Sequence, residues 1–439
     1  MSNAAGVSRR DFVAAASGVA AVATLAPGVA RAAAKRRRYA IVGTGVRGIG
    51  MWGRPLVERY ADVLEFVGLC DVNPLRVEYA RKAIGAACPT FTSLDAMLEQ
   101  AKPELLMVTT VDTTHEGCIV KALERGVDVL TEKPMVVDET QCQSVLDAEK
   151  RTGRKIGVTF NYRYAPKHQK IKELLQSGAI GRVTSVDFSW YLDTSHGADY
   201  FRRWHRLRSQ GGSLWVHKST HHFDLVNWWL DADPVEVSAF GSLQQYGKQG
   251  PFRHSHCRPC PHKAECRYHW DITKSPRLVS LYVDCEKADG YLRDGCVFKE
   301  DVDIPDTMNA VVKYSNGVQM SYSVNTFMPI EGYRLAFNGT EGRLEVRDFE
   351  RQPWAAPETE MHVIKNFGER QEIVIPRAEG GHGGGDDVLR DLVFRGITLP
   401  EHMRLPGSRA GAMSCLTGIA ARKSMDAGKP VRIADLVRI

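Results

Sequence analysis

A glycine motif near the beginning of the chain constrains the fold more than any other feature. The apolar run 39–42 leads directly into G-T-G-V-R-G at 43–48, and the next apolar segment, 64–70, ends on Asp71. Glycines between a strand and a helix let the backbone approach a pyrophosphate, and an acid after the second strand accepts hydrogen bonds from ribose hydroxyls. The pattern predicts a dinucleotide site, and a carboxylate favours NAD because it would repel a 2′-phosphate. The residues assigned to it are Gly43, Gly45, Val46, Arg47, Gly48 and Asp71.

The segment that follows keeps alternating between strand-like and helix-like patterns. Strands are expected at 104–110, 127–131 and 155–160, and helices at 115–125 and 138–152. This alternation predicts an α/β fold with a parallel sheet and right-handed crossovers. Ligands in such folds bind beyond the carboxyl ends of the strands. We therefore add four residues from two such loops to the predicted cofactor site, namely Thr110, His115, Glu132 and Lys133.

The N-terminus has the pattern of an export signal. Ser8-Arg9-Arg10-Asp11-Phe12-Val13 is a twin-arginine motif, and an Ala-rich stretch follows it to small residues near position 34. The stretch is short and contains Pro27, so it is a poor membrane anchor. We expect residues 1–34 to be a signal peptide read by the twin-arginine translocase, with an exported or periplasmic product that has no membrane span after processing. An uncleaved anchor is the alternative.

Chain length and net charge limit the possible domain organisation and the possible partners. With 439 residues the chain divides naturally into at least two domains, here 37–158 and 159–439. The formal net charge of +6 is a mild excess for that length, and no basic stripe interleaved with aromatic residues is present. A nucleic-acid partner is therefore not expected.

Several motifs together resemble the Gfo/Idh/MocA family of oxidoreductases. They are Glu132-Lys133-Pro134, the glycine motif, the segments 161–164 and 211–214, and His221-His222-Phe223-Asp224. The resemblance implies a Rossmann domain followed by an α/β domain with an open, largely antiparallel sheet, through which the chain would form a homo-oligomer. It also implies a Lys-Pro bond that is often cis, with Lys133 polarising a sugar or polyol hydroxyl and His221 acting as acid and base.

The chain departs from that family at the positions before the histidine. His217 and Ser219 stand where many members have Asp and Gly, and Lys218 lies between them. Lys218 is therefore a third candidate catalytic residue, three positions from His221. Candidate contacts to a carbohydrate substrate lie in the second domain and in the glycine-rich loop 380–385: Arg163, Tyr164, Arg203, His205, His217, His222 and His382.

A cysteine-rich insertion is expected at about 250–300, before a C-terminal helix at about 407–427. Cys257, Cys260 and Cys266 have a spacing that suits a structural zinc or an iron–sulfur centre. Disulfides, which an oxidising periplasm permits, and free thiols are the alternatives. The segments 331–334 and 338–342 are both expected to be hairpin turns.

These observations favour an NAD-dependent oxidoreductase acting on a CH–OH group of a sugar, sugar derivative or polyol. Two alternatives stay open. One is an NAD-retaining, glycoside-cleaving enzyme that oxidises C3 transiently and then eliminates the aglycone. The other is a sugar sensor without catalysis, which the presence of both Lys133 and His221 disfavours.

Overall fold

The strands and helices of the chain build two sheets within residues 36–439, which form one compact unit. The computed structural model describes residues 35–351 and 355–438, so the predicted signal peptide lies outside the described residues. No helix in the described part of the chain has the length and apolar character needed to cross a membrane.

The first sheet is the predicted Rossmann domain. Its six strands are all parallel and run in the order β3-β2-β1-β4-β5-β6. The strands are β1 (Arg37–Val42), β2 (Leu64–Cys70), β3 (Thr90–Phe91), β4 (Leu105–Val108), β5 (Asp128–Thr131) and β6 (Ile156–Val158). The helices are α1 (Val46–Gly50), α2 (Arg54–Arg59), α3 (Pro74–Ile84), α4 (Leu94–Ala101), α5 (His115–Glu124) and α6 (Glu139–Thr152), with the 3-10 turn η1 (Asp112–Thr114).

Local chemistry explains these boundaries. β4 is buried along its whole length, which suits its unbroken apolar sequence. The Asp138 side chain caps α6 by accepting a hydrogen bond from the backbone N–H of Gln141, 2.8 Å away. The helix ends at Gly153, whose φ of +66° is the left-handed conformation that glycine adopts easily.

The second sheet has nine strands in the order β14-β13-β12-β11-β7-β10-β9-β8-β15. Only β7 and β10 pair in parallel within it; the other neighbours are antiparallel. The predicted open, largely antiparallel sheet is confirmed. Its strands are β7 (Val183–Asp193), β8 (Pro234–Ser242), β9 (Thr307–Tyr314), β10 (Gln319–Met328), β11 (Gly332–Gly339), β12 (Gly342–Phe349), β13 (Glu358–Lys365), β14 (Arg370–Pro376) and β15 (Val431–Arg432).

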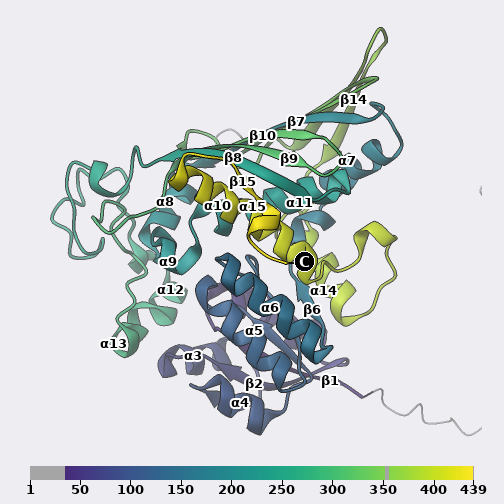
Figure 1. Cartoon of the computed structure of the whole chain (residues 1–439). Coiled ribbons are helices and arrows are strands. Elements are labelled where there is room, and N and C mark those ends of the chain that lie inside the picture. The colour runs from purple at the N-terminus through teal and green to yellow at the C-terminus, as the bar shows by residue number, and fades with distance from the viewer. Residues whose placement is uncertain (1–34, 352–354, 439) are drawn as a thin grey trace, which may run out of the picture. The chain divides into compact units, whose positions relative to one another are not determined.

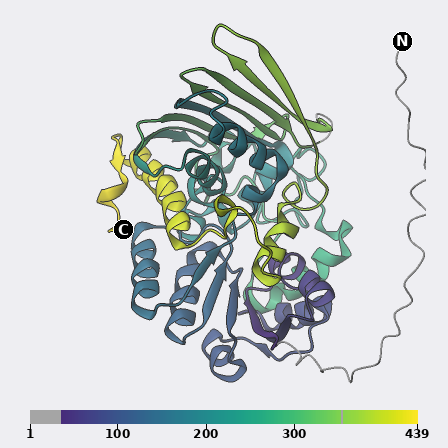
Figure 2. The ribbon, with the colours of Figure 1, turned by 90° about the vertical axis from the view of Figure 1, so that its right-hand side faces the viewer.

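Helices cover one face of this sheet, as Figures 1 and 2 show for α11 and α15. Along β9, alternate residues are buried and exposed, so the opposite face meets solvent. At Gly418 in α15 an added Cβ would lie 2.2 Å from the Trp215 carbonyl oxygen, so only glycine allows the helices to approach this closely. The helices are α7 (Pro166–Gln176), α8 (Thr194–Arg202), α9 (Arg208–Gly211), α10 (Leu214–His217), α11 (Thr220–Leu230), α14 (Gly385–Phe394) and α15 (Ser408–Ala427).

The cysteine-rich insertion connects β8 to β9. Within it are only the short helices α12 (Pro276–Leu281) and α13 (Glu286–Asp289) and brief 3-10 turns. The insertion also contacts the Rossmann domain: the Asn73 side chain donates to the Cys285 carbonyl at 2.9 Å, and the Tyr282 hydroxyl accepts from the Val46 N–H at 3.3 Å. It therefore lies against the glycine loop.

One of the two predicted hairpin turns is wrong. β11 and β12 pair as a hairpin across 338–342, as expected. β10 and β11, however, lie on opposite sides of β7, so the chain crosses over before β11, and residues 332–334 are already part of that strand and not of a hairpin turn. Glu331 is thereby brought into the interior, where only 2% of it is exposed.

Candidate active site

The glycine loop has the close backbone packing that a nucleotide-binding turn needs. Gly43 has a φ of +89°, and a Cβ there would lie 2.6 Å from the backbone of Thr109 and Thr110. A Cβ on Gly48 would lie 2.3 Å from the Gly43 carbonyl oxygen. Glycine at both positions is thus required for the tight turn and for the contact between strand and helix.

Asp71 is buried at the end of β2 and is held by four donors. One carboxylate oxygen accepts from the Thr44 N–H at 2.8 Å and its hydroxyl at 3.0 Å. The other accepts from the Asn73 N–H at 3.0 Å and from Arg76 at 3.2 Å. These contacts fix the position of the carboxylate at the end of β2. Arg76 is itself bound by a second carboxylate, Asp289 of the insertion, at 2.8 Å.

Glu132, at the end of β5, ties the glycine loop to the catalytic loop. It accepts hydrogen bonds from Arg47 at 2.6 Å and from the Trp52 indole at 2.7 Å. Burial acts to raise the pKa of Glu132, but the Arg47 charge and the Trp52 hydrogen bond outweigh it and lower that pKa. Glu132 is thus an ionised anchor for Arg47, which also faces Asp386 at 3.6 Å.

His115 joins the two loops that the sequence predicts at the cofactor site. Its Nδ1 lies 2.8 Å from the Pro134 carbonyl oxygen and its Nε2 lies 3.2 Å from that of Thr110. Burial lowers its pKa, which favours the neutral ring. Both ring nitrogens face protein carbonyls, so His115 positions the loops. The Thr110 side chain accepts a hydrogen bond from Thr114 at 2.8 Å.

Lys133 reaches from the Rossmann domain to the second domain. Its peptide bond to Pro134 is cis, as the family resemblance implies. Its Nζ donates to the His217 carbonyl oxygen at 3.0 Å. Burial lowers the pKa of Lys133 to about 8, although Asp112 and Glu132 oppose that shift. Its ammonium group therefore titrates close to physiological pH.

His217 has a carboxylate partner that the sequence did not indicate. Its Nδ1 lies 2.5 Å from Asp112 Oδ2, in η1 after β4. Burial lowers the pKa of His217 well below its usual range and raises the pKa of Asp112. The only sequence signal for Asp112 was its position in the loop between Thr109 and His115, which follows a parallel strand.

His221, in the first turn of α11, has the environment of a buried base. It is 4% exposed, and its Nδ1 has no hydrogen-bond partner among the described residues. Its ring centroid lies 4.6 Å from that of Tyr162 and 5.9 Å from that of His382. Burial lowers its pKa well below the usual range, and the Lys133 charge adds to this effect. The neutral ring is therefore favoured, and its Nδ1 is left without a protein partner.

His382 lies close to His221 although 161 positions separate them in the sequence. Its φ of +51° is unusual for a residue with a side chain and follows from the glycine-rich loop around it. Its Nδ1 lies 3.1 Å from Asp386, and its ring centroid lies 5.2 Å from that of Tyr162. The structure thus brings together three of the candidates, Lys133, His221 and His382.

Lys218 and His222 lie on Trp190 of β7. The Lys218 ammonium is 4.7 Å from the centroid of the indole, and the His222 ring stacks on it at 4.1 Å. His222 also contacts the Tyr322 hydroxyl at 2.6 Å. Burial lowers the pKa of Lys218, while Glu331 and Glu350 act to raise it. Lys218 is thus a buried cation beside the histidines, whereas His222 is part of the packed core.

His205 lies against His217 on the other side of the cluster. The two ring centroids are 4.1 Å apart, and Trp204 stacks on His205 at 3.6 Å. Burial lowers the pKa of His205 well below its usual range, and Arg203 adds to this. Arg203 faces Asp199 at 3.3 Å.

Arg163 and Tyr164 have partners inside the protein. The Arg163 guanidinium makes two hydrogen bonds to Asp224, of 2.8 and 2.6 Å. The Tyr164 hydroxyl donates to the Arg404 carbonyl at 3.3 Å, and its ring belongs to the apolar core. The expectation that both bind substrate does not fit this arrangement, because Asp224 occupies the guanidinium fork and Tyr164 is 3% exposed.

A polar pocket of about 320 Å³ adjoins His221. Tyr162 and His382 line this pocket and also contact the His221 ring. The sequence did not indicate its other polar groups, which come from separate elements and occur in pairs. His196 bonds Glu331 at 2.8 Å, Lys167 bonds Asp348 and Glu350, and Arg351 faces Asp193. Such donors and acceptors suit a ligand with many hydroxyl groups.

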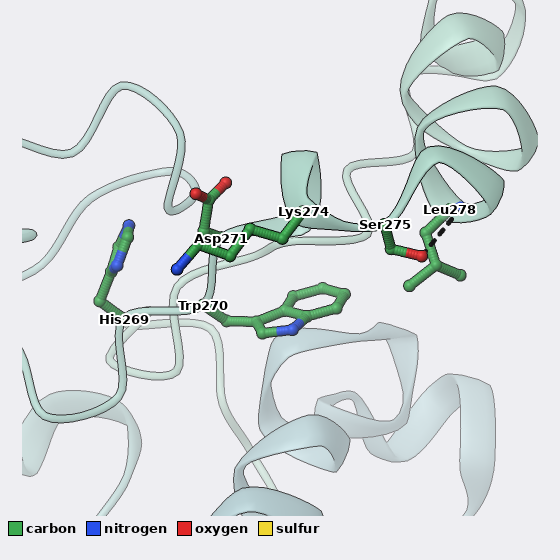
Figure 3. Close-up of a pocket in the computed structure, with 6 residues that line it drawn as sticks. All are labelled: His269, Trp270, Asp271, Lys274, Ser275 and Leu278. Atoms are coloured by element: carbon green, nitrogen blue, oxygen red, sulfur yellow. Dashed lines mark hydrogen bonds between the residues drawn. The ribbon is translucent and has the colours of Figure 1, made fainter.

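A second pocket lies in the insertion and contains none of the candidate catalytic residues. Figure 3 shows its lining, with Trp270 below the extended Lys274 side chain. The nearby cysteines form no disulfide. The described residues also contain no group of three or more His, Cys, Asp or Glu that could hold a metal ion. The expectation of a metal ion bound by Cys257, Cys260 and Cys266 is therefore not supported by the described residues.

Comparisons with known proteins agree with this architecture. Residues 37–160 match the model described as "Oxidoreductase family, NAD-binding Rossmann fold", and residues 172–433 match the C-terminal alpha/beta domain of the same family, GFO_IDH_MocA. The Bacillus subtilis (strain 168) protein YteT is 41% identical over 90% of this chain and 98% of its own length. An inositol 2-dehydrogenase/D-chiro-inositol 3-dehydrogenase of Lactiplantibacillus plantarum is 24% identical over 46% of this chain and 55% of its own.

Solved structures share the fold at low sequence identity. A levoglucosan dehydrogenase in complex with NADH and levoglucosan has a TM-score of 0.66, with 16% identity over 91% of this chain and 100% of its own. An aldose-aldose oxidoreductase from Caulobacter crescentus complexed with glycerol has a TM-score of 0.60, with 16% identity over 91% of this chain and 100% of its own.

Proposed function

Because the chain belongs to the Gfo/Idh/MocA family of oxidoreductases, we propose that it removes hydride from a CH–OH group of a sugar, sugar derivative or polyol and transfers it to NAD. One observation carries the proposal: Lys133 and His221 come from different domains and share one buried site, where His221 Nδ1 has no protein partner. The names of the inositol and levoglucosan dehydrogenases among its relatives support the substrate class.

The residues around the glycine loop fit NAD. Gly43 and Gly48 leave the backbone bare where a pyrophosphate would approach, and Asp71 stands at the end of β2. Arg76, the cation beside Asp71, is neutralised by Asp71 and Asp289 together, so it is a weak partner for a 2′-phosphate. NAD supplies the hydride acceptor when it is bound.

The protein's own groups move the proton and stabilise charge. As the C–H bond breaks, the hydroxyl proton must leave, and neutral His221 accepts it at Nδ1. The Lys133 ammonium stabilises the oxygen as it gains negative charge. His217 holds Lys133 through its main-chain carbonyl, and Asp112 orients the His217 ring. The paired polar groups of the pocket bind the remaining hydroxyls.

Single-turnover kinetics test this proposal directly. The NAD-loaded protein is mixed with a panel of sugars and polyols, and formation of NADH is followed by absorbance. We expect His221→Ala to slow the chemical step by roughly 10²–10⁴-fold, the range for loss of a positioned base. NAD affinity, measured by calorimetry, should stay close to wild type. Near-normal single-turnover rates in His221→Ala would contradict the mechanism.

One observation favours a second candidate, a glycoside-cleaving enzyme that retains its NAD and regenerates it in each cycle. The insertion packs on the glycine loop through Tyr282 and on Asn73, after β2, through Cys285, which would hinder nucleotide exchange. The purified protein is denatured and the released nucleotide is assayed. Stoichiometric NAD, together with aglycone release from glycosides and no net NADH, supports this candidate; nucleotide-free protein that turns over added NAD supports the dehydrogenase.

We also propose export through the twin-arginine route and self-association through the open sheet face. The twin-arginine motif at 8–13 supports the first, and Arg9→Lys, Arg10→Lys should retain the protein in the cytoplasm of its host. Phe240 and Val311, on the solvent face of β8 and β9, are 76% and 52% exposed and support the second. Light scattering should show an oligomer that Phe240→Asp, Val311→Asp dissociates.

A further inference from the structure

Four cysteines of the insertion line a single cavity, although only three are neighbours in the sequence. They are Cys257, Cys260, Cys266 and Cys296. A bridge between His256 and Gly295 brings the first and last of them together. Beside it, the Cys257 N–H donates to the Asp294 carbonyl at 2.8 Å and the Cys296 N–H to that of Ser255 at 3.3 Å. The fold thus adds a fourth sulfur to the three of the sequence motif.

Backbone donors are directed at these sulfurs. The Phe298 N–H donates to Cys296 Sγ at 3.4 Å, and the Tyr268 N–H donates in the same way to Cys266, also two residues before it. The Trp270 N–H donates to the Cys257 sulfur. A thiol sulfur is a weak acceptor, so an arrangement of several N–H donors around such sulfurs suits metal-bound thiolates.

A buried cation completes the surroundings. Arg202 is 6% exposed, and one of its nitrogens donates to Cys257 Sγ at 3.2 Å. Its other contacts are with the carbonyls of Tyr268 and Gly295 and with the Trp270 ring at 5.9 Å, and the Asp199 carboxylate of the same helix interacts with its charge. Burying a guanidinium is costly unless negative charge lies close to it. Asp199 supplies part of that charge, and thiolates in the cavity would add to it.

The insertion also lacks regular structure that could hold it together. Between Ser242 and Thr307 the described chain has no strand, and its longest helix is α12, Pro276–Leu281. A loop of this length without regular structure usually has a function or a cross-link. None of its cysteines is in a disulfide. A metal centre would provide the missing cross-link, because metal binding contributes directly to folding.

The arrangement also distinguishes between kinds of centre. Zinc requires its ligands to converge on one ion, with Zn–S distances of about 2.3 Å. No group of described His, Cys, Asp and Glu residues meets that requirement. An iron–sulfur cluster binds its four cysteines through different iron atoms, so their sulfurs lie farther apart. We propose that Cys257, Cys260, Cys266 and Cys296 hold an iron–sulfur cluster that fixes the insertion. This proposal does not depend on the proposed reaction.

The first experiment measures the cofactor itself. The full chain is purified without oxygen and analysed for iron, acid-labile sulfide and zinc. A sample with low iron is incubated with ferrous iron, sulfide and thiol, desalted, and analysed again. We expect iron and sulfide in equal amounts, with a broad visible absorption that dithionite bleaches. Zinc without sulfide, or no iron and sulfide retained after reconstitution, would overturn the proposal.

The second experiment identifies the ligands. Cys296→Ser should lose most of the iron and sulfide, whereas Cys285→Ser should keep both, because Cys285 is buried in the same insertion but lies outside the cavity. Alkylation of the wild-type chain gives the same information without a variant. The four cavity cysteines should react only after the iron is removed by a chelator, and Cys285 should react equally in both states. Full cluster content in Cys296→Ser, or alkylation of the four regardless of iron, would refute this ligand set.

Discussion

His217 Nδ1 lies 2.5 Å from a carboxylate oxygen of Asp112, although 105 positions separate the two residues. Asp112 belongs to the loop after β4 in the Rossmann domain, and His217 ends α10 in the second domain. The main-chain carbonyl of the same histidine accepts from Lys133 Nζ. Two loops of the nucleotide domain therefore fix His217, one through its ring and the other through its backbone. His217 in turn links these two loops to the segment that carries His221.

Replacing the Asp112 carboxyl group tests this connection. Asp112→Asn keeps the size of the side chain but removes the carboxyl group that faces the His217 ring and interacts with Lys133. We expect kcat to fall by roughly 10²-fold, the lower end of the range for acid–base groups, with KM for NAD unchanged. Asp95→Asn, at an exposed carboxylate, is the control. An equal change in KM and kcat would instead indicate a general loss of structure.

The pH profile tests the state of Lys133. Its pKa is lowered to about 8 by burial, so the ammonium is charged below that pH and neutral above it. A role in stabilising a developing alkoxide requires the charged form, so oxidation should slow as the pH rises through about 8. Lys133→Arg keeps its charge at high pH and should lose this alkaline limb, whatever its maximal rate. An unchanged limb would assign the titration to another group. Lys133→Ala should lower the rate by ~10²–10⁴-fold below about pH 8, where the wild-type ammonium is charged, and the difference should shrink at higher pH.

The fold could be predicted from the sequence because its signals are local. The strand before Gly43, the acid after β2 and the alternation up to β6 are all periodic patterns within short windows. The order of strands in the second sheet was not predictable to the same degree. β7 accepts β10 on one side and β11 on the other, so the turn at Glu331 looked like a hairpin but is a crossover.

The site was predictable only where a motif marks it. Lys133 and His221 were identified because they lie in motifs, and their shared environment supports that assignment. The sequence did not identify Asp112 as the partner of His217, nor Cys296 as a neighbour of the cysteine motif. A single sequence contains no signal for contacts between residues that lie far apart in the chain. Arg163 shows the opposite error: it lies in a family motif, but Asp224 occupies its guanidinium.

Cofactor preference depends on Asp71 and its neighbour. Asp71→Ala should weaken NAD binding by about 1–3 kcal/mol, the cost of losing hydrogen bonds to a charged acceptor. The same change frees Arg76 from one of its two carboxylates, so NADP affinity should rise relative to NAD. Asp289→Asn removes the other carboxylate and leaves Asp71 intact, which isolates the effect of Arg76. Titration of both nucleotides measures this. NADP binding as tight as NAD in the wild type would contradict the assignment.

The free energy of unfolding and KM together test whether Arg163 stabilises the fold or binds substrate. Asp224→Ala leaves a buried guanidinium without its carboxylate, and we expect a loss of about 3–5 kcal/mol in the free energy of unfolding. KM of the protein that remains folded should be unchanged. Glu78→Ala, at an exposed pair with Arg81, should have little effect on the same denaturant curve. A raised KM with unchanged stability would return Arg163 to the substrate site.

The role of Lys218 is decided by a variant that keeps its volume. Its ammonium lies over Trp190 and beside the histidines, and burial lowers its pKa although Glu331 and Glu350 oppose this shift. Lys218→Met preserves the packing on the indole and removes the charge. If the charge helps to stabilise the substrate oxygen, the single-turnover rate should fall by roughly 10²-fold, the effect of removing one electrostatic donor. Lys299→Met, at another partly buried lysine far from the candidate site in sequence, should leave that rate unchanged.

A normal rate in Lys218→Met, with normal thermal stability, would show that the departure from the family pattern at this position has no catalytic role. His217 or His382 would then be the next residue to substitute.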